Sequence, residues 1–180
     1  MLPTWLLEEL IDSEVFTAIF FVFPIFWSNV STAIFGGGLP MDFRKNWFDG
    51  KRILGNNKTI RGFATGLIVG FLVGLFSWWL LTEIVIVNYE IKFYYGLLLG
   101  LGTVVGDAVG SFIKRRMNIP SGGSLIGVDQ IGYVLFGLIF GRMLVAFPWT
   151  YWLITIPLAG MVHFASNTVS YLIGWKDVWW

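Results

Sequence analysis

The chain has 180 residues, of which 56% are hydrophobic and 13% are charged, and its mean hydropathy is +0.73. A water-soluble domain of this length could not hide so much apolar surface in one core, so the composition indicates a membrane protein. The formal net charge of +1 excludes no class of partner, whereas the absence of cysteine excludes disulfides and thiolate metal sites.

The chain begins with the acidic stretch MLPTWLLEELIDSE, which lacks the basic start and the small-residue cleavage site of a secretory signal. We therefore expect this stretch to remain in the mature protein.

Five apolar segments follow. Residues 15–35 and 62–82 contain no charge, and each is long enough to cross about 30 Å of hydrocarbon as a helix. Residues 93–113 are interrupted only by Asp107, residues 131–147 only by Arg142, and residues 149–175 contain the only histidine, His163. We predict an all-α integral membrane protein in which residues 1–180 form a single transmembrane domain of five helices.

The basic residues indicate the orientation of these helices. The loops 36–61 and 114–130, together with Lys176, hold ten of the 12 lysines and arginines. The positive-inside rule places such loops in the cytoplasm. We therefore expect a multi-pass protein of the cell membrane with its N-terminus outside, its C-terminus in the cytoplasm and two functional cytoplasmic loops.

Glycines recur every fourth residue from Gly62 to Gly74 and nearly so from Gly96 to Gly110. Small residues at this spacing let helix backbones approach closely in lipid, so we expect two packing faces.

Asp107 is a carboxylate inside an apolar segment, in the stretch VVGDAVGSFIKRR. Such a group is costly unless it is paired, solvated or bound to a cation. On a helix, the side chains of Asp107, Ser111, Lys114 and Arg115 fall on one stripe that descends about 12 Å from the cytoplasmic surface. An internal ion pair with Lys114 or Arg142 would explain Asp107 without a function, and a ligand or metal site is the alternative that we favour.

Asp129 follows the turn-rich loop NIPSGGSLIG at the start of the fourth apolar segment, so a second carboxylate returns to the boundary where Asp107 lies. Two carboxylates without a nearby histidine or cysteine suit a hard cation such as Mg²⁺, which completes its shell with water and substrate phosphates. By itself, Asp129 could equally cap the N-terminus of the next helix.

The first basic loop ends in FDGKRILGNNKTIRGF, which combines glycines and polar turn residues with Lys51, Arg52, Lys58 and Arg61. Backbone amides beside glycine, together with lysine and arginine, suit polyphosphate binding, and Arg61 could grip a phosphate through two hydrogen bonds. The spacing of a P-loop is absent. A bare basic loop would otherwise be a topogenic or anionic-lipid-binding segment.

Arg142 and His163 are explained by snorkelling or by hydrogen bonds between helices, so we assign neither to the site. A small transporter or channel would instead use Asp107, Arg142 and His163 as an intramembrane relay. Asp107 lies near the cytoplasmic end rather than at the midplane, and no inverted repeat is evident, which both argue against that class. A non-catalytic scaffold would leave the two loop motifs unexplained.

The string G-D-x-x-x-S-x-x-K-R at residues 106–115, followed by a glycine-rich loop and an aspartate, resembles the motif of membrane CTP:phosphatidate cytidylyltransferases. Within that superfamily, L-G-N-x-K-T-x-R-G in the first loop, here residues 54–62, is similar to the archaeal CDP-archaeol synthase family. The resemblance runs from about Asp49 to the C-terminal KDVWW, and two motifs in the right order argue against coincidence.

The resemblance implies transfer of a cytidylyl group from CTP to 2,3-di-O-geranylgeranylglyceryl phosphate, giving CDP-archaeol and pyrophosphate. The alternative within this class is a CDP-diacylglycerol synthase that acts on phosphatidate. The implied partners are CTP, an isoprenoid glycerol ether lipid phosphate and membrane lipids, without nucleic acid, and a homodimer stays open.

The resemblance also implies roles for individual residues. We expect Asp107 and Asp129 to hold Mg²⁺, and Asp107, Asp129 and Lys114 to be catalytic. The residues expected to contact the nucleotide and the phosphates are Gly55, Asn57, Lys58, Thr59, Arg61, Ser111, Arg115 and Arg116. Bacterial members carry further acids where this chain has Gly110 and Gly132, so only two aspartates are candidates for metal ligands.

Overall fold

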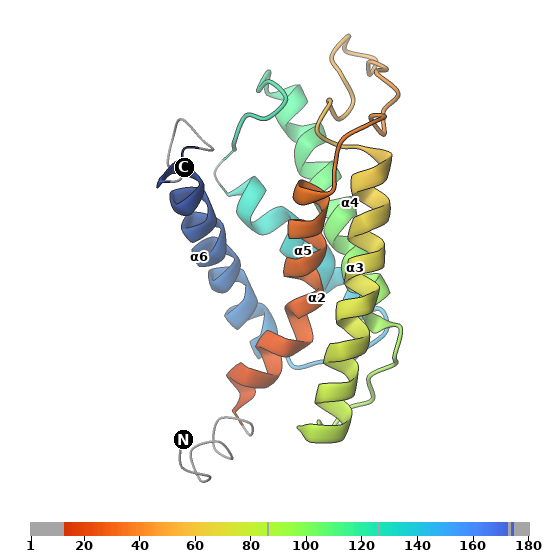
Figure 1. Ribbon diagram of the computed structural model, residues 1–180, viewed down its shortest axis with the longest axis vertical. Helices are drawn as coiled ribbons and strands as arrows, with labels where there is room; N and C mark the ends of the chain where they lie inside the picture. Colours follow the sequence, from red (N-terminus) through yellow and green to blue (C-terminus); the bar gives the residue numbers. More distant parts are fainter. Residues whose placement is uncertain (1–12, 86, 126, 173, 175–180) are drawn as a thin grey trace.

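The computed structural model describes residues 13–85, 87–125, 127–172 and 174, and within them every side chain except those of 166, 167, 169 and 170. The expected N-terminal stretch up to residue 12 and Lys176 therefore lie outside the described residues. The elements are α2 (Glu14–Ile34), α3 (Ile60–Trp79), the π-helical turn η1 (Leu80–Ile84), α4 (Tyr95–Arg116), α5 (Val128–Arg142) and α6 (Thr150–Leu172), which Figure 1 shows as a bundle. The described part contains no strand beyond two isolated bridges, Pro40 with Thr59 and Asn46 with Arg52, so the all-α prediction is confirmed.

Within the part of the chain that the structure describes, three helices are long and apolar enough to cross a membrane, namely α2, α3 continued by η1, and α4. A shorter apolar stretch occupies Thr150–Ala165 of α6. Local side chains set where these helices begin. The hydroxyl of Ser13 accepts a hydrogen bond from the Phe16 amide at the start of α2, and the hydroxyl of Thr59 accepts one from the Gly62 amide at the start of α3.

The fourth apolar segment, expected over residues 131–147, is helical only as far as Arg142, where α5 ends. Phe147 precedes Pro148, and a residue in that position is disfavoured in the α conformation. The guanidinium of Arg142 donates a hydrogen bond to the Phe147 carbonyl oxygen and lies over the Phe147 ring. The chain between α5 and α6 is therefore folded back onto the end of α5.

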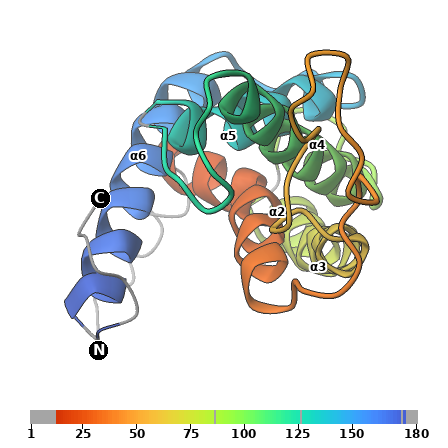
Figure 2. The same ribbon diagram turned by 90° about the horizontal axis from the view of Figure 1, so that it is seen from above.

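Helix α4 lies between α3 and α5, and glycines make both contacts close (Figure 2). A Cβ atom on Gly70 of α3 would lie 2.9 Å from the Cα atom of Gly100 of α4. On the other face of α4, a Cβ atom on Gly106 would lie 2.6 Å from the carbonyl oxygen of Gly132 of α5. No larger side chain fits at these crossings, so the expectation of glycine packing faces is confirmed.

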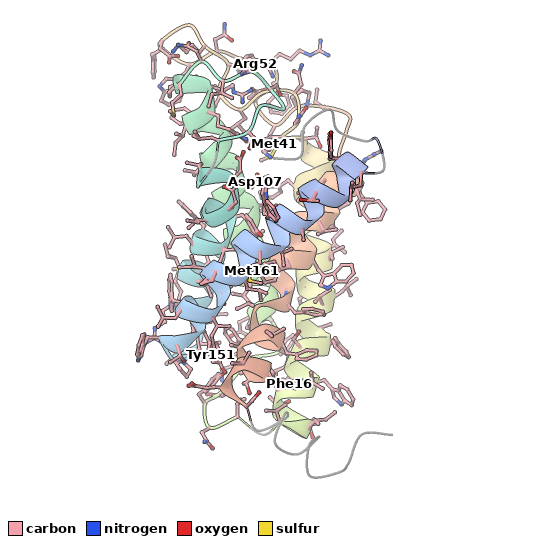
Figure 3. The ribbon with its side chains drawn as sticks, turned by 90° about the vertical axis from the view of Figure 1, so that its left-hand side faces the viewer. Phe16, Met41, Arg52, Asp107, Tyr151 and Met161 are labelled. Atoms are coloured by element: carbon pink, nitrogen blue, oxygen red, sulfur yellow. The ribbon has the colours of Figure 1, made fainter. Side chains whose placement is uncertain are left out.

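An aromatic core closes one end of the bundle. Phe21, Tyr95, Phe147 and Tyr151 come from three helices and the α5–α6 connection, and all are at most 1% exposed. The ring centroids of Phe21 and Phe147 lie 4.7 Å apart, and those of Phe21 and Tyr95 lie 5.1 Å apart. Figure 3 shows Tyr151 at this end and Asp107 and Arg52 toward the other, so the polar residues of interest lie away from the best-packed part of the fold.

Candidate functional site

The first loop, residues 35–59, is organised around the carboxylate of Asp42. Its side chain is fully buried and accepts hydrogen bonds from the Arg52 guanidinium, at 2.7 and 3.1 Å, and from the amides of Leu54 and Gly55, each at 3.0 Å. Burial by itself raises the pKa of Asp42, but the hydrogen bonds from Arg52, Gly55, Leu54 and the Arg44 amide outweigh it and hold the pKa well below its usual range. The loop is therefore a folded structure and not a flexible basic segment.

The second loop is folded back by cations in the last turn of α4. Lys114 Nζ donates to the Gly123 carbonyl oxygen at 3.1 Å, and Arg115 Nη2 donates to the Pro120 carbonyl oxygen at 3.1 Å. At the other end of the loop, the Leu125 amide donates to Asp129 Oδ2 at 2.8 Å. Cations also complement the partial negative charge at a helix C-terminus, so these residues stabilise α4 and the loop together.

Contacts through Arg116 and Lys51 hold the two loops together. Arg116 Nε lies 2.8 Å from Asp49 Oδ2, and the same guanidinium donates to the Arg52 carbonyl oxygen. Lys51 Nζ donates in return to the Arg116 carbonyl oxygen at 2.8 Å. The loops therefore form one cap over the end of the bundle where Asp107 lies.

Beneath this cap are two adjacent chambers that share lining residues. The α3 chamber has a volume of about 450 Å³ and lies between α2, α3 and α4, where it is lined by Asn29, Thr32, Ala33, Gly36, Gly37, Met41, Asn56, Asn57, Lys58, Thr59, Phe63, Val104, Asp107 and Ala108. The α5 chamber has a volume of about 310 Å³ and is lined by Asn29, Ala33, Leu54, Asn57, Lys58, Asp107, Ser111, Lys114, Arg115, Ser121, Gly122, Gly123, Ser124, Asp129 and His163. Lys58, Asp107 and Asn29 line both chambers, so they stand at the boundary between them.

Each aspartate of the site is paired with a lysine. Lys58 Nζ lies 2.6 Å from Asp107 Oδ2, and Lys114 Nζ lies 2.7 Å from Asp129 Oδ1. For an internal ion pair, the sequence had suggested Lys114 or Arg142 as the partner of Asp107. In the structure the partner is Lys58 instead. Arg142 bonds instead to Phe147, so the relay of Asp107, Arg142 and His163 is not assembled.

The donor set fits a hard divalent cation that is completed by a ligand. Among the described residues no three His, Cys, Asp or Glu side chains gather around one point. The α5 chamber nevertheless offers two carboxylates and the hydroxyl of Ser111, all of which are oxygen donors. Mg²⁺ needs only one or two carboxylates when phosphate oxygens and water supply its other ligands.

The structure brings together most of the predicted site residues. The stripe Asp107, Ser111, Lys114 and Arg115 faces the α5 chamber as a unit, and Asp129 lies opposite it. Asn57 and Lys58 reach both chambers from the first loop, and Thr59 lines the α3 chamber while its hydroxyl caps α3.

Three predicted residues lie apart from the chambers. Arg61 donates to the carbonyl oxygens of Phe35 and Gly36 at the end of α2, and Arg116 joins the two loops. Gly55 is a structural residue of the first loop, with φ +104°, and a Cβ atom there would lie 3.1 Å from Arg115 Nη1. Its positive φ and this contact explain why the loop needs glycine.

Three contributors to the site were missed by sequence reasoning. Asn29 of α2 and His163 of α6 line the α5 chamber, and Asp42 builds the loop that carries Lys58. A signal for Asn29 existed in the polar cluster SNVST near the end of an otherwise apolar segment. His163 was noticed but was explained by contacts within the membrane.

The helices and the chambers together define a membrane-embedded protein with a polar site built from two aspartates and several cations beneath two loops. The chain belongs to the CDP-archaeol synthase family, because the family described as "CarS-like: CDP-archaeol synthase" matches residues 9–180. The resemblance found in the sequence is thereby confirmed.

Individual relatives cover nearly the whole chain. The CDP-archaeol synthase of Pyrococcus horikoshii is 40% identical over 177 residues, which span 93% of this chain and 98% of the relative. The CDP-archaeol synthase of Methanocaldococcus jannaschii is 39% identical over 174 residues, which span 92% and 97% of the two chains. A solved structure described as an intramembrane enzyme for archaeal membrane lipids biosynthesis matches with a TM-score of 0.73 and 26% identity, and the match covers 83% of this chain and 92% of that one.

Proposed function

We propose that this protein transfers a cytidylyl group from CTP to 2,3-di-O-geranylgeranylglyceryl phosphate, giving CDP-archaeol and pyrophosphate. The observation that carries the proposal is the α5 chamber, in which the motif residues Asp107, Ser111, Lys114 and Arg115 face Asp129. The names of the curated relatives support the same reaction.

The reaction needs no nucleophile from the protein. An oxygen of the lipid phosphate attacks the α-phosphorus of CTP in line, a new P–O bond forms, and the bond from the α-phosphorus to the bridging oxygen breaks as pyrophosphate leaves. Both reactants are anions, so the protein must bring them together, orient them and neutralise their charge. Lys58, Lys114 and Arg115 line the chamber and can do this by binding phosphate oxygens.

Asp107 and Asp129 are the residues that would hold Mg²⁺. The bound ion would supply further positive charge next to the phosphate oxygens. Arg115 can bind a phosphate directly, because it lines the α5 chamber and forms no ion pair with a carboxylate among the described residues. Ser121, Gly122 and Ser124 add a turn of polar groups on the side of the second loop.

We further propose that all five helices cross the membrane and that the chambers open toward the cytoplasm. The cap over the chambers consists of the two loops that hold most of the basic residues, which supports a cytoplasmic position. CTP is polar and cytosolic, while the phosphate of a lipid lies at the headgroup plane. A site at the cytoplasmic end of the bundle is reachable by both.

The decisive experiment supplies purified protein in detergent with CTP, Mg²⁺ and a panel of lipid phosphates, and detects products by mass spectrometry. We expect a CDP-lipid from the geranylgeranyl ether substrate and its loss when Mg²⁺ is omitted or chelated. Phosphatidate in the same panel tests the diacylglycerol alternative. The variants Asp107→Asn and Asp129→Asn should each be inactive while eluting as the wild type does in size exclusion, and full activity in either would exclude its carboxylate as a metal ligand.

A further inference from the structure

His163 lines the α5 chamber, yet the transfer chemistry proposed above gives it no role. It is the one lining residue that comes from α6, among those that the structure describes, and it shares the chamber with Asp129 and Lys114. A polar side chain inside an apolar helix is costly unless it meets polar partners, so its position beside these charges calls for a reason.

The position of His163 follows from the way α6 packs. Tyr151, Thr155 and Ala159 form a stripe with a spacing of four residues, and each is at most 1% exposed against the rest of the bundle. His163 is the next residue on this stripe. It faces the same direction as the buried residues, but at a level where the chamber replaces the packed core.

The second half of α6 diverges from the bundle. On the stripe itself, Tyr151, Thr155 and Ala159 are at most 1% exposed, whereas His163 is only partly buried. Figures 1 and 2 show α6 separating from α2 and α5 toward this end. Asn29 and Ala33 of α2 line the same chamber as His163 of α6, so the chamber borders both helices.

The elements that line the α5 chamber differ in chemistry. Lys58 and the turn 121–124 come from the charged cap. His163 comes from α6, a helix whose exposed residues are apolar. A triphosphate matches the lining from the cap, whereas a single phosphate attached to apolar chains matches the lining from α6.

We infer that His163 binds the phosphate of the acceptor lipid, which reaches the chamber from the membrane between α2 and α6. This inference rests on the proposed cytidylyl transfer. An imidazole N–H can donate a hydrogen bond to a phosphate oxygen in both protonation states. The apolar side chain of Phe164, the exposed residue that follows His163 on α6, would lie along the isoprenoid chains of the bound lipid.

The test is a separation of two Michaelis constants. In His163→Ala, the KM for the lipid phosphate should rise about 10- to 100-fold, as expected for the loss of a hydrogen bond to a charged group, while the KM for CTP stays within about twofold. His163→Gln keeps an N–H donor and should recover most of the affinity for the lipid. Leu153→Ala is the matched control, because Leu153 is an exposed residue of α6 far along the helix from the chamber.

CTP binding measured by calorimetry without lipid should be the same in His163→Ala and the wild type, which also shows that the variant is folded. An unchanged lipid KM in His163→Ala would overturn the inference, and so would a rise in the KM for CTP alone. These outcomes are distinct from failure of the proposed function, in which the wild type itself would form no CDP-lipid from any member of the panel.

Discussion

Lys58 Nζ and Asp107 Oδ2 lie 2.6 Å apart at the boundary of the two chambers. One residue comes from the first loop and the other from the interior of α4, so this ion pair joins the cap to the bundle. Both side chains are about a quarter exposed, which leaves the pair accessible to a ligand that could exchange partners with it. A metal ion and a phosphate group would be such partners.

Replacing Lys58 tests the role of this cation and of its ion pair with Asp107 in the reaction. Lys58→Met should lower kcat/KM on the order of 100-fold, because the phosphates lose a cation and Asp107 loses its partner. Lys58→Arg should retain more activity than Lys58→Met. The matched control is Lys45→Met, which removes an exposed cation from the same loop. Equal activity of Lys58→Met and Lys45→Met in a CDP-lipid assay would show that Lys58 contributes only to the total positive charge of the loop.

Asp42 should decide the stability of the first loop. Asp42→Asn should destabilise the loop by about 2–4 kcal/mol, since the Arg52 guanidinium and the amides of Leu54 and Gly55 lose a charged acceptor. Hydrogen exchange of residues 42–55 would measure the loss. Arg44→Gln is the control, because only the backbone amide of Arg44 bonds to Asp42.

The lowered pKa of Asp42 also predicts how the stability of this loop depends on pH. A carboxyl whose pKa is lower in the folded than in the unfolded state contributes stability above its unfolded pKa, near 3.9, and loses it as pH falls through the folded pKa. Protection of residues 42–55, corrected for intrinsic exchange, should therefore be constant from about pH 8 down to about pH 4. A loss of protection between pH 7 and pH 5 would contradict this assignment.

Glycine contacts should control the packing of α3 on α4. Gly70→Val should lower the melting temperature in detergent and abolish activity, because a Cβ atom at that position would meet the Gly100 Cα atom at 2.9 Å. Gly160→Val of α6 is the matched control, since a Cβ atom there has no neighbour within 4 Å. If both variants melt at the same temperature, the close approach of α3 and α4 does not stabilise the fold.

The orientation of the protein in the membrane can be tested by labelling introduced cysteines. The chain itself contains no cysteine that would react. Phe48 is 96% exposed in the first loop, and Glu90 lies in the loop between η1 and α4. In right-side-out vesicles, a membrane-impermeant thiol reagent should label Glu90→Cys and spare Phe48→Cys until the vesicles are opened. The reverse pattern would place the chambers outside the cell.

The sequence predicted correctly those relationships between residues that follow from helical periodicity. Asp107, Ser111, Lys114 and Arg115 share a chamber because they lie on one helical stripe, which their spacing predicts. The apolar lengths predicted α2, α3 with η1 and α4 for the same reason.

Contacts formed by loops could not be predicted in this way. The pairing of Lys58 with Asp107 depends on how the first loop folds around Asp42, and a single buried carboxylate in a loop has no periodicity by which to recognise it. Arg61 shows the same limit, because a guanidinium near a glycine-rich turn can bind a phosphate or, as here, the carbonyl oxygens at the end of α2.

The glycines on both faces of α4 have a consequence for how Asp107 is held. Helices separated by large side chains can shift when those side chains change rotamer, whereas contacts between backbones offer few alternative arrangements. Gly100, about two turns before Asp107, and Gly106, immediately before it, hold α4 through its backbone on two sides. Rotamer changes of side chains in the bundle should therefore move the Asp107 backbone little relative to α3 and α5. The distances from Asp107 to these two helices should vary little as the temperature rises.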